Sequence, residues 1–94
     1  QIDGACETVM DTSPLEEKCR AFGFETVEID GHDLVAISEA ITQAKVNQNG
    51  KPKMIILRTI KGKGVSFMEN NASWHGKAPN SEEAEQALKE LGER

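Results

Sequence analysis

The chain has 94 residues, an apolar share of 37% and a formal net charge of -5, a composition that suits one small globular domain or part of a larger one. Its acidic balance argues against general nucleic-acid binding, because that function requires a basic face. No run approaches the ~20 apolar residues of a membrane span, and no basic segment followed by an apolar stretch opens the chain, so we expect neither a membrane span nor a signal peptide.

The first third of the chain predicts the end of a strand, a helix and a second strand. Residues 1–4, Gln-Ile-Asp-Gly, are typical of the carboxyl end of a strand. Ser13 is expected to cap a helix that has a proline in its first turn and a glutamate at the capping-box position, and Gly23 is expected to end that helix. Residues 24–30 alternate and include β-branched side chains, which favours a strand.

Three further elements are predicted in the rest of the chain. Asp33 is a good N-cap for an apolar stripe of helical spacing that runs to about residue 47. The uninterrupted apolar residues 54–57 predict a strand buried on both faces, as parallel strands usually are. After a long loop, Asn80 and the two glutamates that follow it predict the start of a third helix, which Gly92 is expected to end.

This order of elements predicts the α/β class, with an open, mainly parallel sheet of three strands and flanking helices. Such a sheet has two edges and needs more chain to cover it. The apolar faces of residues 34–44 and 84–91 also exceed what three strands can cover. We therefore expect the core to be completed elsewhere, either by sequence outside these residues or by a homo-oligomer.

The loop at residues 61–79 carries the main candidates for chemistry, because ligands of parallel α/β sheets bind beyond the carboxyl ends of the strands. Loops of this length are usually functional or disordered. His75 is suited to donate a hydrogen bond or to shuttle a proton; the alternative is a surface histidine packed against Trp74. Lys61-Gly62-Lys63-Gly64 suits a diphosphate; the alternative is a plain basic turn, since it matches neither a Walker A loop nor a Rossmann fingerprint.

Other residues capable of chemistry are interpreted as structural. Cys6 and Cys19 have no CxxC or zinc-ligand spacing, which predicts two reduced thiols in a cytoplasmic protein, with Cys19 on the buried side of a helix; the alternative is one disulfide between them. His32 is expected in a turn. Asp30 and Asp33 are expected to cap a helix and not to bind a metal.

The sequence resembles transketolase, specifically the carboxyl-terminal part of its thiamine-diphosphate-binding amino-terminal domain. The most specific match is the loop formed by Ile60–Val65 and Ser73–Lys77, and residues 1–4, 20–24 and 28–33 fit in the same order. The resemblance covers residues 1–94. It is closest to the separate amino-terminal subunit of split bacterial transketolases.

The resemblance implies an enzyme of the pentose phosphate pathway that transfers a two-carbon ketol unit between sugar phosphates, with thiamine diphosphate and Mg²⁺. His75 would lie near the diphosphate and the reacting carbonyl and would serve catalysis, cofactor binding and substrate binding. Lys61 would contact the diphosphate, and Ile2 would lie against the thiamine. Lys63 and Lys77 would steer phosphate groups.

The resemblance also implies that part of the site lies outside this chain. The family's Gly-Asp-Gly segment and its metal-binding asparagine would precede residue 1, so no metal ligand is expected here. The glutamate that activates the cofactor would belong to another domain or to a carboxyl-terminal transketolase subunit. We therefore expect the 94 residues alone to be inactive. Two alternatives stay open: another thiamine-diphosphate enzyme such as deoxyxylulose-phosphate synthase, or a non-catalytic α/β interaction module.

Overall fold

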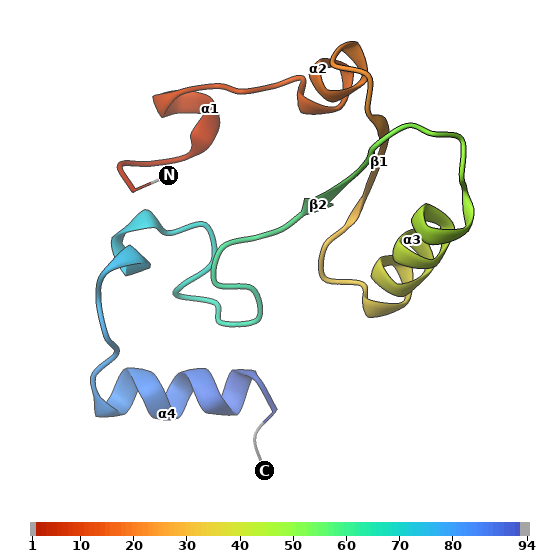
Figure 1. Ribbon diagram of the computed structural model, residues 1–94. Helices are drawn as coiled ribbons and strands as arrows, with labels where there is room; N and C mark the ends of the chain where they lie inside the picture. Colours follow the sequence, from red (N-terminus) through yellow and green to blue (C-terminus); the bar gives the residue numbers. More distant parts are fainter. Residues whose placement is uncertain (1, 93–94) are drawn as a thin grey trace. The chain divides into compact units, whose positions relative to one another are not determined.

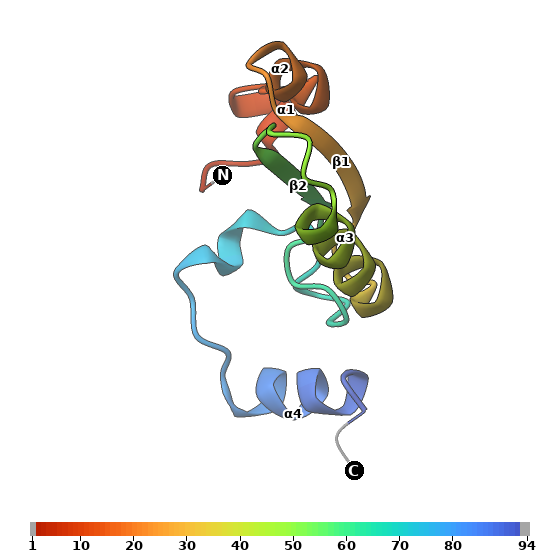
Figure 2. The same ribbon diagram turned by 45° about the vertical axis from the view of Figure 1, so that its right-hand side comes forward.

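The computed structural model describes residues 2–92 (Figures 1 and 2). The chain divides into two compact units, one formed by residues 12–59 and the other by residues 2–11 together with residues 60–92. Each unit is described by itself. No helix within residues 2–92 is long and apolar enough to cross a membrane.

The unit at residues 12–59 is a small α/β structure. Its elements in chain order are α2 (Leu15–Ala21), β1 (Glu25–Asp30), α3 (Leu34–Val46) and β2 (Lys53–Arg58). β1 and β2 pair in parallel, with Val27 opposite Ile55. α2 packs against β1, and α3 packs against both strands. The predicted α/β class with a parallel sheet and flanking helices is thus confirmed.

The start of α2 differs from the prediction. Pro14 occupies the N-cap position itself, and no side chain caps the helix. The predicted assignment of Ser13 as the N-cap is therefore wrong, since that position is one residue further along the chain. Lys18 instead reaches back, and its Nζ donates to the carbonyl oxygens of Thr12 and Ser13 at 2.9 and 3.0 Å. Gly23 ends the helical segment with a φ of 91°, as predicted.

The N-cap of α3 follows the prediction. The Asp33 carboxylate accepts hydrogen bonds from the backbone amides of Val35 and Ala36 at 2.9 and 3.1 Å. These are two of the amides that the first turn of a helix leaves without a partner. Asp30 caps the preceding turn by accepting from the His32 amide at 2.8 Å.

The sheet is smaller and more exposed than predicted. Within residues 2–92 it has two strands, β1 and β2, and residues 2–4 form no strand. Residue 1, where the predicted first strand begins, lies outside the described residues. The prediction that residues 54–57 are buried on both faces is also wrong, since Leu57 is 44% exposed and the other three are half-buried. Two strands with only α2 and α3 packed against them leave too little chain to enclose the sheet.

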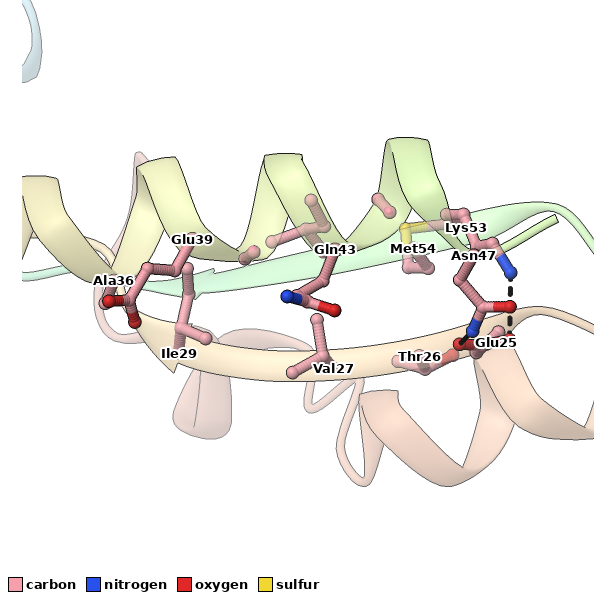
Figure 3. Close-up of a pocket in the computed structure, with 13 residues that line it drawn as sticks. Glu25, Thr26, Val27, Ile29, Ala36, Glu39, Gln43, Asn47, Lys53 and Met54 are labelled. Carbon is pink, nitrogen blue, oxygen red and sulfur yellow. Dashed lines mark hydrogen bonds and ion pairs between the residues drawn. The ribbon is translucent and has the colours of Figure 1, made fainter.

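A cavity of about 440 Å³ lies between α3 and the sheet. The helix side is lined by small residues, Ala36, Ala40 and Ala44, which leave the space open. In Figure 3 the Gln43 side chain extends from α3 toward Val27 across this space. The cavity is thus a gap in helix-on-sheet packing, and its other lining residues include both apolar side chains, such as Val27 and Ile55, and polar ones, such as Glu39 and Asn47.

The second unit consists of short elements and turns. Its helices are α1 (Cys6–Val9), the 3-10 helix η1 (Ala72–His75) and α4 (Ser81–Glu90). Only α4 was predicted; α1 lacks a side-chain cap, and η1 lies inside the segment predicted as loop. Asn80 and Glu83 form the predicted capping box, and Gly92 follows α4 with a φ of 77°.

Candidate functional site

The loop after β2 begins with a tight turn that only glycine fits. The Lys63 amide donates to the Ile60 carbonyl oxygen at 3.2 Å. Gly62 has a φ of 71°, and a Cβ there would lie 2.6 Å from the carbonyl oxygen of Met68. A side chain would therefore be both strained and in collision with the backbone.

Hydrogen bonds close the first half of the loop on itself. The Asn70 amide donates to the Lys61 carbonyl oxygen at 2.9 Å. The Gly64 amide donates to the Glu69 carboxylate at 3.0 Å. The backbone around Lys61 is therefore held at both sides of the turn, while its ammonium group stays exposed.

A second set of contacts ties this loop to α4. Val65 is one of the buried apolar residues, at 5% exposure. The Ser66 backbone amide and hydroxyl both donate to the Glu90 carboxylate, at 2.5 and 2.8 Å. Hydrogen bonds from Gln86 and then Ser66 lower the pKa of Glu90, because they favour its ionised form. The loop is thus fastened by packing and by a charged acceptor.

The second half of the loop is organised around Trp74. Its Nε1 donates to the Phe67 carbonyl oxygen at 3.0 Å, and the two rings meet at a centroid distance of 5.5 Å and an angle of 59°. Lys77 Nζ lies 4.1 Å from the indole centroid, on its face. The same ammonium forms an ion pair with Glu83 at 3.3 Å.

Lys61 and His75 are exposed and lie on this one loop. His75 is the last residue of η1, which Asn71 starts by accepting a hydrogen bond from the Ser73 amide at 3.1 Å. Within residues 2–92, neither the Lys61 ammonium nor the His75 imidazole forms a hydrogen bond or ion pair. Both groups are therefore available to an anionic or carbonyl ligand. The aromatic partner of Trp74 is Phe67, not His75.

The other expected site residues lie differently. Ile2 is 61% exposed and precedes α1 on a separate segment of the chain. Lys63 is exposed. Lys77, in contrast, already pairs with Glu83 and covers the indole, so part of its charge is neutralised before any phosphate arrives.

The described part of the chain provides no metal centre. No group of three or more His, Cys, Asp or Glu side chains that could hold a metal occurs within residues 2–92. Cys6 is an exposed free thiol and Cys19 a half-buried one. The donor set of the loop, an ammonium group and an imidazole, suits an anion.

Sequence reasoning missed the contacts that shape this loop. The aromatic pair and the Lys77–Glu83 ion pair join positions that no local pattern relates. The turn at η1 had a usable signal, because Asn71 stands two residues before a serine, the spacing of an Asx-turn.

Comparisons with known proteins show which family this chain is similar to. The family described as transketolase, thiamine diphosphate binding domain, matches residues 1–94. The chain is 40% identical over 91 residues to one of the subunits of apulose-4-phosphate transketolase from Actinobacillus succinogenes, covering 97% of the chain and 32% of that protein. It is 46% identical over 91 residues to the SqwG subunit of 6-deoxy-6-sulfo-D-fructose transketolase from a Clostridium species, covering 97% and 33%. Mouse transketolase is 37% identical over 76 residues, with coverages of 81% and 12%.

The family match over residues 1–94 defines a thiamine-diphosphate-binding domain. The parallel α/β unit is consistent with that domain. The chain belongs to the transketolase family. It spans about a third of the length of the two bacterial relatives. The resemblance to split bacterial transketolases is confirmed, since both relatives are named as subunits.

Proposed function

We propose that residues 1–94 are the carboxyl-terminal portion of the diphosphate-binding domain of a transketolase, and that Lys61 and His75 belong to its active site. The observation that carries the proposal is that these two polar groups stand exposed and without partners within residues 2–92, on a loop that is otherwise closely hydrogen-bonded. A rigid loop that presents free polar groups is suited to hold a charged ligand.

Each residue has a distinct role in this proposal. Thiamine diphosphate, when bound, supplies the carbanion chemistry for transfer of a two-carbon ketol unit between sugar phosphates. The Lys61 ammonium offsets the negative charge of the diphosphate. The His75 imidazole donates a hydrogen bond to the diphosphate or to the substrate and moves a proton at the carbonyl oxygen that reacts. Ile2 provides apolar contact to the thiamine.

The remaining parts of the site come from outside the described residues. We propose that Mg²⁺ is held by ligands that precede residue 1. The names of the two bacterial relatives support a partner protein, namely the carboxyl-terminal transketolase subunit. We further propose a homo-oligomer, supported by exposed apolar residues such as Leu34 and Leu91, and a cytoplasmic location, where both thiols would stay reduced.

The test is ketol transfer by the intact protein assembled with its partner subunit. His75→Ala is expected to lower kcat by about 100-fold, within the range for loss of a general acid or base. Lys61→Met is expected to weaken the apparent affinity for thiamine diphosphate about tenfold or more, because it removes a charge-assisted contact. His32→Ala is the matched control, since His32 lies exposed in the unit at residues 12–59. Full activity of His75→Ala would overturn the role given to His75.

A second measurement concerns the 94 residues alone. Calorimetry with thiamine diphosphate and Mg²⁺ is expected to detect no tight binding, because the proposed metal ligands are missing. A micromolar dissociation constant would show that the chain holds a complete site by itself, and would contradict this division of the site between segments.

A further inference from the structure

We propose that Trp74 is a positioning residue for His75, and that Lys77 and Glu83 fix the orientation of its indole. The inference rests on the proposed function, because it concerns the imidazole that would meet cofactor and substrate. It adds three side chains that act through His75. All four residues lie in the same compact unit of the chain.

The imidazole of His75 has no anchor of its own. Its side chain is exposed and has no hydrogen-bond or ion-pair partner within residues 2–92. His75 closes the four-residue 3-10 turn Ala72–His75. The backbone of that turn therefore sets the direction of the Cα–Cβ bond from which the imidazole extends, and the residue next to it in the turn is Trp74.

Three contacts hold the Trp74 side chain from different directions. The hydrogen bond from Nε1 to the Phe67 carbonyl oxygen, at 3.0 Å, fixes the indole along its edge. The tilted contact with the Phe67 ring, at 5.5 Å between centroids, limits its rotation. Lys77 Nζ, 4.1 Å from the centroid, covers one face. Together these contacts define one orientation of the turn that carries His75.

Lys77 connects this arrangement to the first turn of α4. Its ammonium pairs with Glu83 at 3.3 Å. The Glu83 carboxylate is itself fixed, because it accepts from the Asn80 amide at 2.8 Å in the capping box. The hydrogen bond from the Asn80 backbone amide and then the contact with Lys77 lower the pKa of Glu83, because both favour the ionised carboxylate. The indole is thus tied to the start of a regular helix.

If Trp74 only stabilised the loop by packing, we would expect it to be buried among apolar atoms, as Val65 is. Val65 is buried, at 5% exposure, and makes its contribution through packing. Trp74 is only half-buried. Its Nε1 donates a hydrogen bond to Phe67, and one face of its ring contacts the Lys77 ammonium. The two roles predict different effects on the His75 imidazole, which makes Val65→Ala a matched control for loss of packing in the same loop.

The direct test follows the His75 ring by NMR in the intact protein labelled with ¹³C-histidine, without cofactor. His75→Asn identifies the resonance. Trp74→Ala is expected to narrow the line and to shift it toward the values of a mobile loop, and Lys77→Met to do so partially. Val65→Ala and Lys89→Met, an exposed lysine of α4, are expected to leave it in place. An unchanged resonance in Trp74→Ala, or an equal change in Val65→Ala, would overturn the proposal.

Kinetics provides the second readout. Trp74→Phe keeps a ring but removes the Nε1 donor. It is expected to lower kcat about threefold to tenfold, which is the change in rate that corresponds to the free energy of one hydrogen bond. Trp74→Ala is expected to lower it further, with little change in the KM of the sugar phosphate. If His75→Ala proves fully active, the proposed function fails, while the NMR result still decides whether Trp74 positions the ring. Full kcat in Trp74→Ala, with His75→Ala inactive, would overturn the positioning role alone.

Discussion

Glu25, the first residue of β1, forms an ion pair of 2.9 Å with Lys53, the first residue of β2 and its partner in the parallel register. The same carboxylate accepts hydrogen bonds from Asn47 at 2.6 Å and from Asn49. Both asparagines follow α3. One side chain therefore joins the starts of both strands to the end of the helix between them.

This arrangement predicts how stability changes in acid. The hydrogen bond from Lys53 and then that from Asn49 lower the pKa of Glu25 below 4.5. Because the pKa in the folded state is the lower one, the ionised carboxylate stabilises the fold above the unfolded pKa, and this contribution is lost as pH falls below 4.5 through the folded pKa. Glu25→Gln should therefore lower the thermal midpoint at pH 7 by roughly 2–5 °C, as expected for a part-exposed ion pair.

The difference between Glu25→Gln and the unchanged protein should disappear at low pH, where both side chains are neutral. Glu17→Gln is the matched control, because the Glu17 carboxylate has no hydrogen-bond or ion-pair partner within residues 2–92. Thermal unfolding followed by circular dichroism between pH 3 and pH 7 measures both. An equal effect of Glu25→Gln at every pH would show that the loss is not electrostatic.

The N-cap of α3 predicts a second stability effect. Asp33→Ala removes the acceptor of the Val35 and Ala36 amides, and it should lower the free energy of unfolding by about 1 kcal/mol, with a range of about 0.5–2. Asp33→Ser keeps an oxygen that can accept the same bonds and should restore most of the loss. Urea unfolding measures both. Equal destabilisation by alanine and serine would show that the negative charge of Asp33, and not its hydrogen bonds to the helix amides, stabilises the protein.

Caps of this kind were predictable because they depend on neighbours within four residues. Asp33, the Asn80–Glu83 box and Gly23 were found from sequence for that reason. Ser13 shows the limit, since a displacement of one residue put proline in the cap position. The burial of β2 was not predictable, because it depends on what covers a strand and not on the strand's own apolar side chains.

The loop after β2 provides a matched pair of glycine substitutions. Gly62→Ala should destabilise the protein by about 2–3 kcal/mol, because it forces a positive φ and places Cβ 2.6 Å from the Met68 carbonyl oxygen. Gly76→Ala should change stability by no more than about 0.5 kcal/mol, because no atom lies within 4 Å of its Cβ position and its φ is -129°. Urea unfolding of both variants tests this, and a mild Gly62→Ala would mean that the turn can open.

The sequence names candidate residues for the site, but it does not reveal the contacts that support the loop carrying them. Lys61 and His75 were candidates because of their residue types and their place after a strand, and the resemblance to transketolase gave them roles; the family is confirmed over residues 1–94. Their roles stay predictions. Two hydrogen bonds hold the loop, one from Trp74 to Phe67 and one from Ser66 to Glu90. They join residues that are 7 and 24 positions apart in the sequence. No periodic pattern or short motif encodes such pairs, which arise only when the chain folds back.

The same substitution, alanine to leucine, should have opposite effects on stability at Ala40, which lines the cavity between α3 and the sheet, and at Ala87, which is buried. Ala40 lines the open space of about 440 Å³, so the added carbons of Ala40→Leu should find room and raise the free energy of unfolding by about 0.5–1 kcal/mol. Ala87 in α4 is buried, at 9% exposure, so Ala87→Leu should lower it by about 1–3 kcal/mol through overpacking. Urea unfolding compares the two. Equal destabilisation would mean that another segment of the intact protein fills the space beside Ala40.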